Sequence, residues 1–172
     1  MNKYSLIVVS ALLIGGFALL FNLRQPDGGI KSEVKAFMNP YQGKEGFTII
    51  KLPDFLMDQV LPEGDSIQIR KENFKAFRVM IFHQNPSSPY RCDVIQHDMM
   101  TYLDSLKFNQ IVKNPSGKTH IHLYEKNKTD RWKENVAIYN SDSTLFMFNY
   151  ISNLNQQQVI AFSNQLGYQD FL

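Results

Sequence analysis

The stretch NQIVKNPSGKTHIHLYEKNKTDRWKENVAIYNSDSTLFMFNYIS, residues 109–152, decides the fold of this chain. Four runs that contain β-branched and aromatic residues follow one another in it, at residues 109–113, 118–126, 132–140 and 143–152. The sequences NPSG, NKTD and NSDS separate these runs, and each contains residues that favour turns. Four strands joined by short turns predict an antiparallel meander.

Two further strands and two long helices are predicted around the meander. GFTIIKL at residues 46–52 has the composition of a strand, and so has AFRVMIFHQ at residues 76–84. The second of these is apolar on both faces, which is typical of a central strand. Residues 90–106 and 153–166 carry apolar side chains at the helical period.

Helix ends are also visible in the sequence. Asn153 is expected to cap the last helix, with Gln156 as its partner in a capping box. A short helix is predicted at residues 53–61, because Pro53 suits its first position and Pro62 stops it.

These elements predict an α+β fold. Its sheet has about six strands, is mostly antiparallel and has helices packed mainly on one face. Three helices are too few to cover both faces of such a sheet, so we expect the second face to stay partly open.

Residues 4–23 contain no charged residue. A helix of about 20 apolar residues can span a bilayer, and Lys3 precedes this run as in a signal anchor. We therefore expect a hydrophobic helical anchor within residues 1–24, a polar linker at residues 25–36 and a single α+β domain at residues 37–172.

Cleavage of the N-terminal segment is the alternative. Gly16-Phe17-Ala18 resembles a signal-peptide cleavage site, and cleavage after Ala18 would release the domain into the periplasm. Basic residues lie on both sides of the apolar run, so the positive-inside rule is nearly balanced. In either case we expect the domain to lie outside the cytoplasm of a Gram-negative bacterium, at its inner membrane or in its periplasm.

The chain beyond the apolar run is electrically neutral. Of 18 basic and 16 acidic residues, only Lys3 and Arg24 precede position 26, which leaves 16 of each sign. A domain without excess positive charge does not have the surface of a nucleic-acid binder, so we expect no nucleic-acid partner. Cys92 is the single cysteine, which excludes an intramolecular disulfide and a cysteine-based zinc site.

Three segments carry a family resemblance: YQGKEGFTIIKLP at residues 41–53, MMTYLDSLKFNQIVK at 99–113 and TLFMFNYISNLNQQQVIAF at 144–162. They resemble domain-of-unknown-function family 4252, a group of uncharacterised bacterial envelope proteins, over about residues 37–170. The resemblance implies an exported α+β domain and no known activity, cofactor or catalytic residue. The chain departs from the family's lipoproteins because no cysteine follows its apolar run.

A candidate binding surface lies in THIHLYEK, residues 119–126. Strand alternation places His120, His122 and Tyr124 on one face, while the apolar residues between them suit the core. In the next strand Tyr139 is assigned to the same outer face. A face rich in histidine and aromatic residues suits a partner, although a loop or the linker can also cover it.

The histidines carry a competing hypothesis of a metal-binding protein or an enzyme. Two imidazoles on one strand face can begin a zinc or copper site, and His83 at the end of another strand is a third candidate ligand. The sequence does not identify a fourth ligand, which a closed zinc site usually requires. A sheet face, either covered or used for docking, is therefore preferred over a metal site.

No catalytic motif is recognisable. Cys92 and His97 are five residues apart on one helix and point in different directions, and Cys92 lies on the apolar stripe. Asp54 and Asp58 are one turn apart, and Asp54 suits the helix dipole. The sequence has no phosphate loop or nucleophile elbow. It therefore predicts a non-enzymatic, membrane-anchored domain without a cofactor, which binds an envelope protein or senses a signal.

Overall fold

The computed structural model describes residues 30–53, 57, 61, 69–114, 120–141 and 143–168. The apolar run at residues 4–23 and most of the short helix predicted at residues 53–61 lie outside these ranges. The elements in chain order are α2 (Lys35–Met38), η1 (Asn39–Tyr41), β1 (Phe47–Lys51), η2 (Lys71–Asn73), β2 (Phe74–His83), α4 (Cys92–Ser105), β3 (Asn109–Asn114), β4 (His120–Asn127), β5 (Lys133–Asn140), β6 (Thr144–Ser152) and α5 (Gln156–Tyr168). Within the described ranges, no helix is long and apolar enough to cross a membrane.

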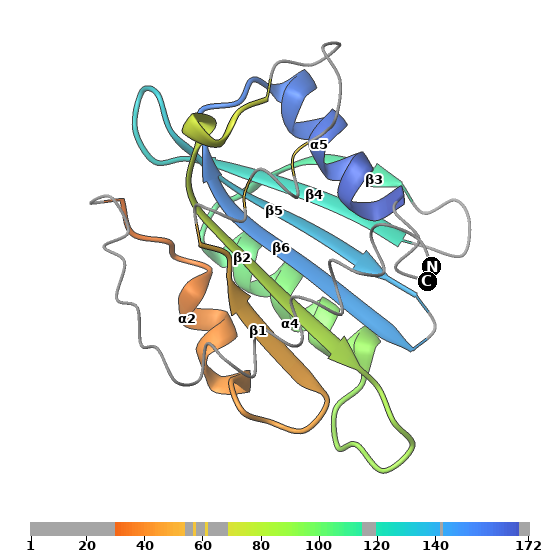
Figure 1. Ribbon diagram of the computed structural model, residues 1–172. Coiled ribbons are helices and arrows are strands. Elements are labelled where there is room, and N and C mark those ends of the chain that lie inside the picture. The colour runs from red at the N-terminus through yellow and green to blue at the C-terminus, as the bar shows by residue number, and fades with distance from the viewer. Residues whose placement is uncertain are drawn as a thin grey trace.

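The strands of the described residues form one six-stranded sheet in the order β1-β2-β6-β5-β4-β3 (Figure 1). Every neighbouring pair is antiparallel, and the predicted meander is confirmed as β3 to β6. Strand β6, the end of the meander, pairs with β2, so β2 is a central strand as predicted. Helix α4 connects β2 to β3, which lies at the far edge of the sheet.

The two faces of the sheet are covered by different helices. Figure 1 shows α5 in front of the strands and α4 behind them. On what we call the α4 face, strand residues such as Met80, Ile138 and Met147 pack with α2 and with the predicted stripe of α4. On the α5 face, strand residues such as Phe77 and Phe148 pack with the predicted stripe Val159, Phe162 and Leu166.

Both faces of the sheet are therefore buried over its middle strands. Two of the three described helices, α2 and α4, share one face of the sheet. Helix α5 covers the other face, so the partly open face that we expected is not found over the middle strands. The physical reason lies in β5 and β6, where consecutive residues are buried and both alternating sets therefore need a partner layer.

The N-terminal cap of α5 lies two residues later than predicted. Asn155 and Gln158 form the capping box, with both backbone-to-side-chain hydrogen bonds at 3.0 Å. Asn153 is bound to Asn73 instead: its N–H donates to the Asn73 carbonyl, and its side-chain oxygen accepts from Asn73 Nδ2 at 2.8 Å. These bonds hold the start of α5 beside the start of β2.

The packed part of the chain begins before residue 37. Val34 and Met38 are buried in the core of the α4 face, and Ser32 and Glu33 bond to the sheet. The boundary predicted between linker and domain is thus too late, because the single turn of α2 is too short to give a periodic pattern.

Candidate functional site

The predicted binding residues do not form one surface. The register of β4 and β5 pairs Tyr124 with Val136 and Tyr139 with Ile121. Tyr124 therefore lies on the α4 face and Tyr139 on the α5 face, and both are buried, with exposed fractions of 1% and 3%. The predicted common outer face is wrong. The prediction assigned the apolar residues of β4 and those of β5 to the same core face. In the structure these residues of β4 lie on the α5 face and those of β5 on the α4 face.

The histidines are not gathered into a site either. His122 is buried, and its Nδ1 lies 3.0 Å from Gln110 Nε2. His83 is exposed beside Thr144 at the end of β2, and β6 and β5 lie between it and β4, so about 14 Å separates the two strands. The side chain of His120 lies outside the described part. Among the described residues, no three His, Cys, Asp or Glu side chains are close enough to hold a metal ion.

Cys92 is a core residue, as predicted. Burial first, and the nearby Asp93 charge second, raise the pKa of its thiol, so it remains protonated. His97 is exposed on the opposite side of the same helix. Asp54 and Asp58 lie outside the described residues.

Tyr139 belongs to a buried polar network beneath α5. Its hydroxyl donates to the carbonyl oxygen of Ser163, and the hydroxyl of Tyr150 lies 2.9 Å from Ser163 Oγ. Burial raises the pKa of both tyrosines strongly. These bonds fix α5 on the sheet, which is a structural role.

The two tyrosines make a testable prediction about alkaline pH. A raised pKa in the folded state means that their contribution to stability is complete below the ordinary tyrosine value near 10 and is lost as the pH rises above it. We expect an alkaline titration followed by tyrosinate absorbance to show two of the eight tyrosines ionising only when the protein unfolds. Tyr139→Phe is expected to leave one such residue. Reversible ionisation of all eight in the folded protein would contradict this network.

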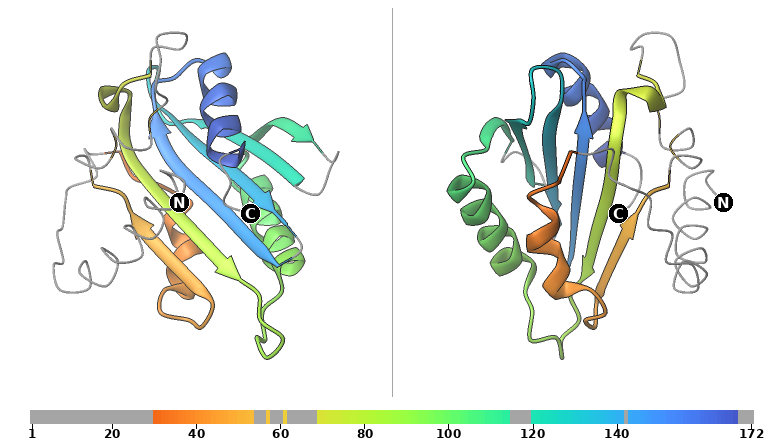
Figure 2. Two further views of the ribbon diagram at one scale, coloured as in Figure 1. Left: turned by 45° about the vertical axis from the view of Figure 1, so that its right-hand side comes forward. Right: turned by 90° about the vertical axis from the view of Figure 1, so that its left-hand side faces the viewer.

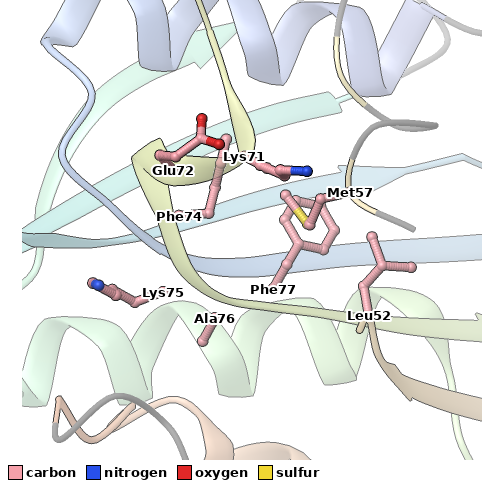
Figure 3. A pocket seen from close by; sticks show the side chains of 8 residues that line it. All are labelled: Leu52, Met57, Lys71, Glu72, Phe74, Lys75, Ala76 and Phe77. Carbon is pink, nitrogen blue, oxygen red and sulfur yellow. The ribbon is translucent and has the colours of Figure 1, made fainter. Parts of the chain in front are cut away.

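A pocket of about 400 Å³ lies at the start of β2 (Figure 3). Its apolar floor consists of Leu52, Met57, Phe74 and Phe77. Leu52 directly follows β1, and Phe74 and Phe77 belong to β2. In Figure 3, Lys71 extends toward Met57 at the rim, while the side chains of Glu72 and Lys75 point away from the floor.

A bulge in β2 creates this pocket. Phe74 pairs with Ser152 and Ala76 with Ile151, so Lys75 is an extra residue between two ladder positions. The extra residue places Phe74 and Phe77 on the same face, where both pack against the ring of Phe162. The bulge left no recognisable signal in the sequence.

A second polar group, which we call the clasp, consists of Ser32, Glu33, Glu134, Asn149 and Lys128. The Glu134 carboxylate is fully buried on the α4 face. It accepts hydrogen bonds from Ser32 Oγ at 2.6 Å, from Asn149 Nδ2 at 3.0 Å and from the backbone N–H groups of Glu33 and Val34. Lys128 Nζ lies 3.5 Å away. The bonds from Ser32, Glu33 and Val34 join the beginning of the described chain to the sheet.

Glu33 extends the clasp to the end of β4. It forms ion pairs with Lys126 at 2.6 Å and with Lys128 at 2.5 Å. Burial on its own raises the pKa of Glu33, but the hydrogen bonds and charges of the two lysines outweigh burial and lower it. The stabilisation from these pairs is therefore present above the ordinary glutamate pKa and is lost as the pH falls through the lowered value.

The sequence analysis did not identify the clasp. Its one visible signal is Glu134, a charged residue at the beginning of a strand whose next five residues are buried. No protein-family model matches this chain, and no curated protein matches it at a significant level. The resemblance to family 4252 stays a prediction.

Proposed function

We propose that this chain is a membrane-anchored domain outside the cytoplasm that binds or senses an envelope partner and has no catalytic activity. The support comes from the uncharged run at residues 4–23 together with the clasp that begins at Ser32. The clasp is the observation that carries the proposal. A domain joined to its anchor by a linker alone would not need buried hydrogen bonds at the point where the linker ends.

The distance between anchor and domain is short. From Leu23 to Ser32 there are nine residues, which reach at most about 30 Å when fully extended. A tether of this length keeps the clasped end of the sheet near the membrane surface and directs the rest of the domain toward the envelope.

The pocket at the start of β2 is the binding position that we propose for the partner. Its apolar floor suits an apolar group of the partner. The pocket lies in the part of the domain that the tether holds close to the membrane, so a partner in the same membrane can reach it.

The full chain, expressed in a Gram-negative bacterium, tests this proposal in two readouts. We expect it to resist alkaline extraction from membranes and to be digested by protease only after the outer membrane is opened. We expect a photo-crosslinking residue in place of Lys71 to give a defined adduct in intact cells, whereas one in place of Lys44, at the other end of the sheet, gives none. Extraction by alkali with a mature N-terminus after Ala18 would overturn the anchor, and equal adducts from both positions would overturn the pocket.

A further inference from the structure

We propose that one end of the sheet rests on the anionic phospholipid headgroups of the membrane that holds the anchor. This end, called the basic end here, consists of Arg70, Lys71, Lys75, Arg131 and Trp132. The inference rests on the proposed anchoring and adds a second, electrostatic contact with the same bilayer.

The register of the sheet brings the residues of the basic end together. Phe74, the first residue of β2, lies opposite Ser152, which also pairs with Lys133, and Lys133 pairs with Asn127. The turn between β4 and β5 therefore lies beside η2 and the bulge of β2. Lys75 Nζ lies 4.9 Å from the centroid of the Trp132 ring, and Arg131 Cζ lies 5.6 Å from it.

The described residues at this end carry a net positive charge, although the chain beyond the apolar run is neutral as a whole. Residues 69–75 and 127–133 contain six basic residues and two acidic ones, Glu72 and Asp130. Lys128 and Lys133 are paired with Glu33 and Glu125, respectively. Arg70, Lys75 and Arg131 are exposed and outnumber the two exposed carboxylates. An excess of this kind is attracted to a surface of anionic lipids.

The clasp fixes which end of the domain faces the membrane. Lys128, in the same turn as Trp132, is bonded to Glu33, only ten residues after the end of the apolar run. Figure 2 shows the described chain beginning near the end of the sheet that carries the β4–β5 turn and η2. Lys31, exposed beside Ser32, adds a further positive charge there.

Trp132 gives the basic end the chemistry of a membrane interface. Its indole is half-buried at the base of the turn, directly before β5, with a cationic group near its ring from each of two segments. Tryptophan is enriched at the headgroup level of bilayers because its ring is amphipathic. Basic residues around it supply the attraction to phosphate, which depends on salt and on lipid charge.

The test uses Trp132 as its own probe, because it is the single tryptophan of the chain. The full chain is reconstituted into vesicles of phosphatidylcholine, or of phosphatidylcholine and phosphatidylglycerol in equal parts, each with a nitroxide-labelled headgroup lipid. We expect quenching of Trp132 to be at least about twofold stronger in the anionic vesicles at low salt, and this difference to disappear at 1 M salt, where the Debye length is about 3 Å. Flotation of the vesicles measures anchoring independently.

Matched variants assign the effect to the basic end. Lys75→Glu with Arg131→Glu is expected to remove the difference between the two lipid compositions. Lys44→Glu with Arg91→Glu, two exposed positions at the other end of the sheet, is expected to preserve it. Circular dichroism of each variant confirms folding, and the salt series on the unaltered chain needs no variant.

The outcomes separate the two proposals. Flotation with equal Trp132 quenching in both lipids would overturn the lipid contact and leave the anchor intact. Failure to float would overturn the anchor and, with it, this inference. Shielding of Trp132 in native membranes but not in protein-free anionic vesicles would assign the basic end to a protein partner and overturn the lipid assignment.

Discussion

Replacing Glu134 by alanine is expected to lower the free energy of unfolding by about 3 kcal/mol, because removing one member of a buried charged network leaves its partners uncompensated. Four hydrogen-bond donors, from Ser32, Glu33, Val34 and Asn149, lose their common acceptor. Chemical denaturation measures the loss, and hydrogen exchange is expected to show faster exchange of the amides of residues 33–38.

Two comparisons make the Glu134 result specific. Glu134→Gln retains an acceptor oxygen and is expected to cost clearly less than alanine. Asp93→Ala removes a carboxylate from an exposed pair with Arg91 and is expected to cost only a small fraction as much. A stability loss below about 1 kcal/mol for Glu134→Ala, with unchanged exchange at residues 33–38, would show that the clasp does not hold the N-terminal segment.

Replacing Phe162 by alanine is expected to cost about 3–5 kcal/mol, the range for deleting a buried aromatic side chain. Phe162 is fully buried, and its ring centroid lies 5.2 Å from that of Phe74, 5.4 Å from that of Tyr150 and 6.0 Å from that of Phe77. Because Phe74 and Phe77 also line the pocket, the variant is expected to weaken any adduct formed from the Lys71 position. Thermal and chemical denaturation measure the stability.

Val94→Ala is the matched control for a shortened side chain on a helix. Val94 is 49% exposed on α4, and alanine has the higher helix propensity, so no loss of stability is expected. A loss from Phe162→Ala no larger than from Val94→Ala would mean that α5 does not pack on the sheet in solution.

Much of the fold could be predicted from local patterns. The turn sequences NPSG, NKTD and NSDS separate the strands, and the apolar stripes of α4 and α5 have the helical period. The pairing of β2 with β6 could not be predicted, because it joins residues far apart in sequence. The capping box at Asn155 was missed because Asn153, two residues earlier, satisfies the same sequence rule with Gln156.

The candidate site was much less predictable. In β4 and β5 each alternating set contains large apolar residues, so the sequence does not indicate which set faces which helix. The register of β4 and β5 determines which set faces which helix, and it places Tyr124 and Tyr139 on opposite faces of the sheet. The clasp and the pocket depend on contacts between distant segments, such as Ser32 with Glu134, and on the bulge at Lys75, neither of which has a local pattern.

The pairing of β2 with β6 has a consequence for the synthesis of the chain. The paired residues are between 61 positions apart, at His83 and Thr144, and 78 positions apart, at Phe74 and Ser152. Strands β1 and β2 therefore leave the ribosome well before their neighbour exists, with the apolar rings of Phe77 and Phe82 still without their partner layers. Because the meander from β3 to β6 is built from local hairpins, we expect it to fold first and to provide the edge onto which β2 docks. The export that we propose would require the earlier half of the domain to be kept from aggregating until the last strand has crossed the membrane.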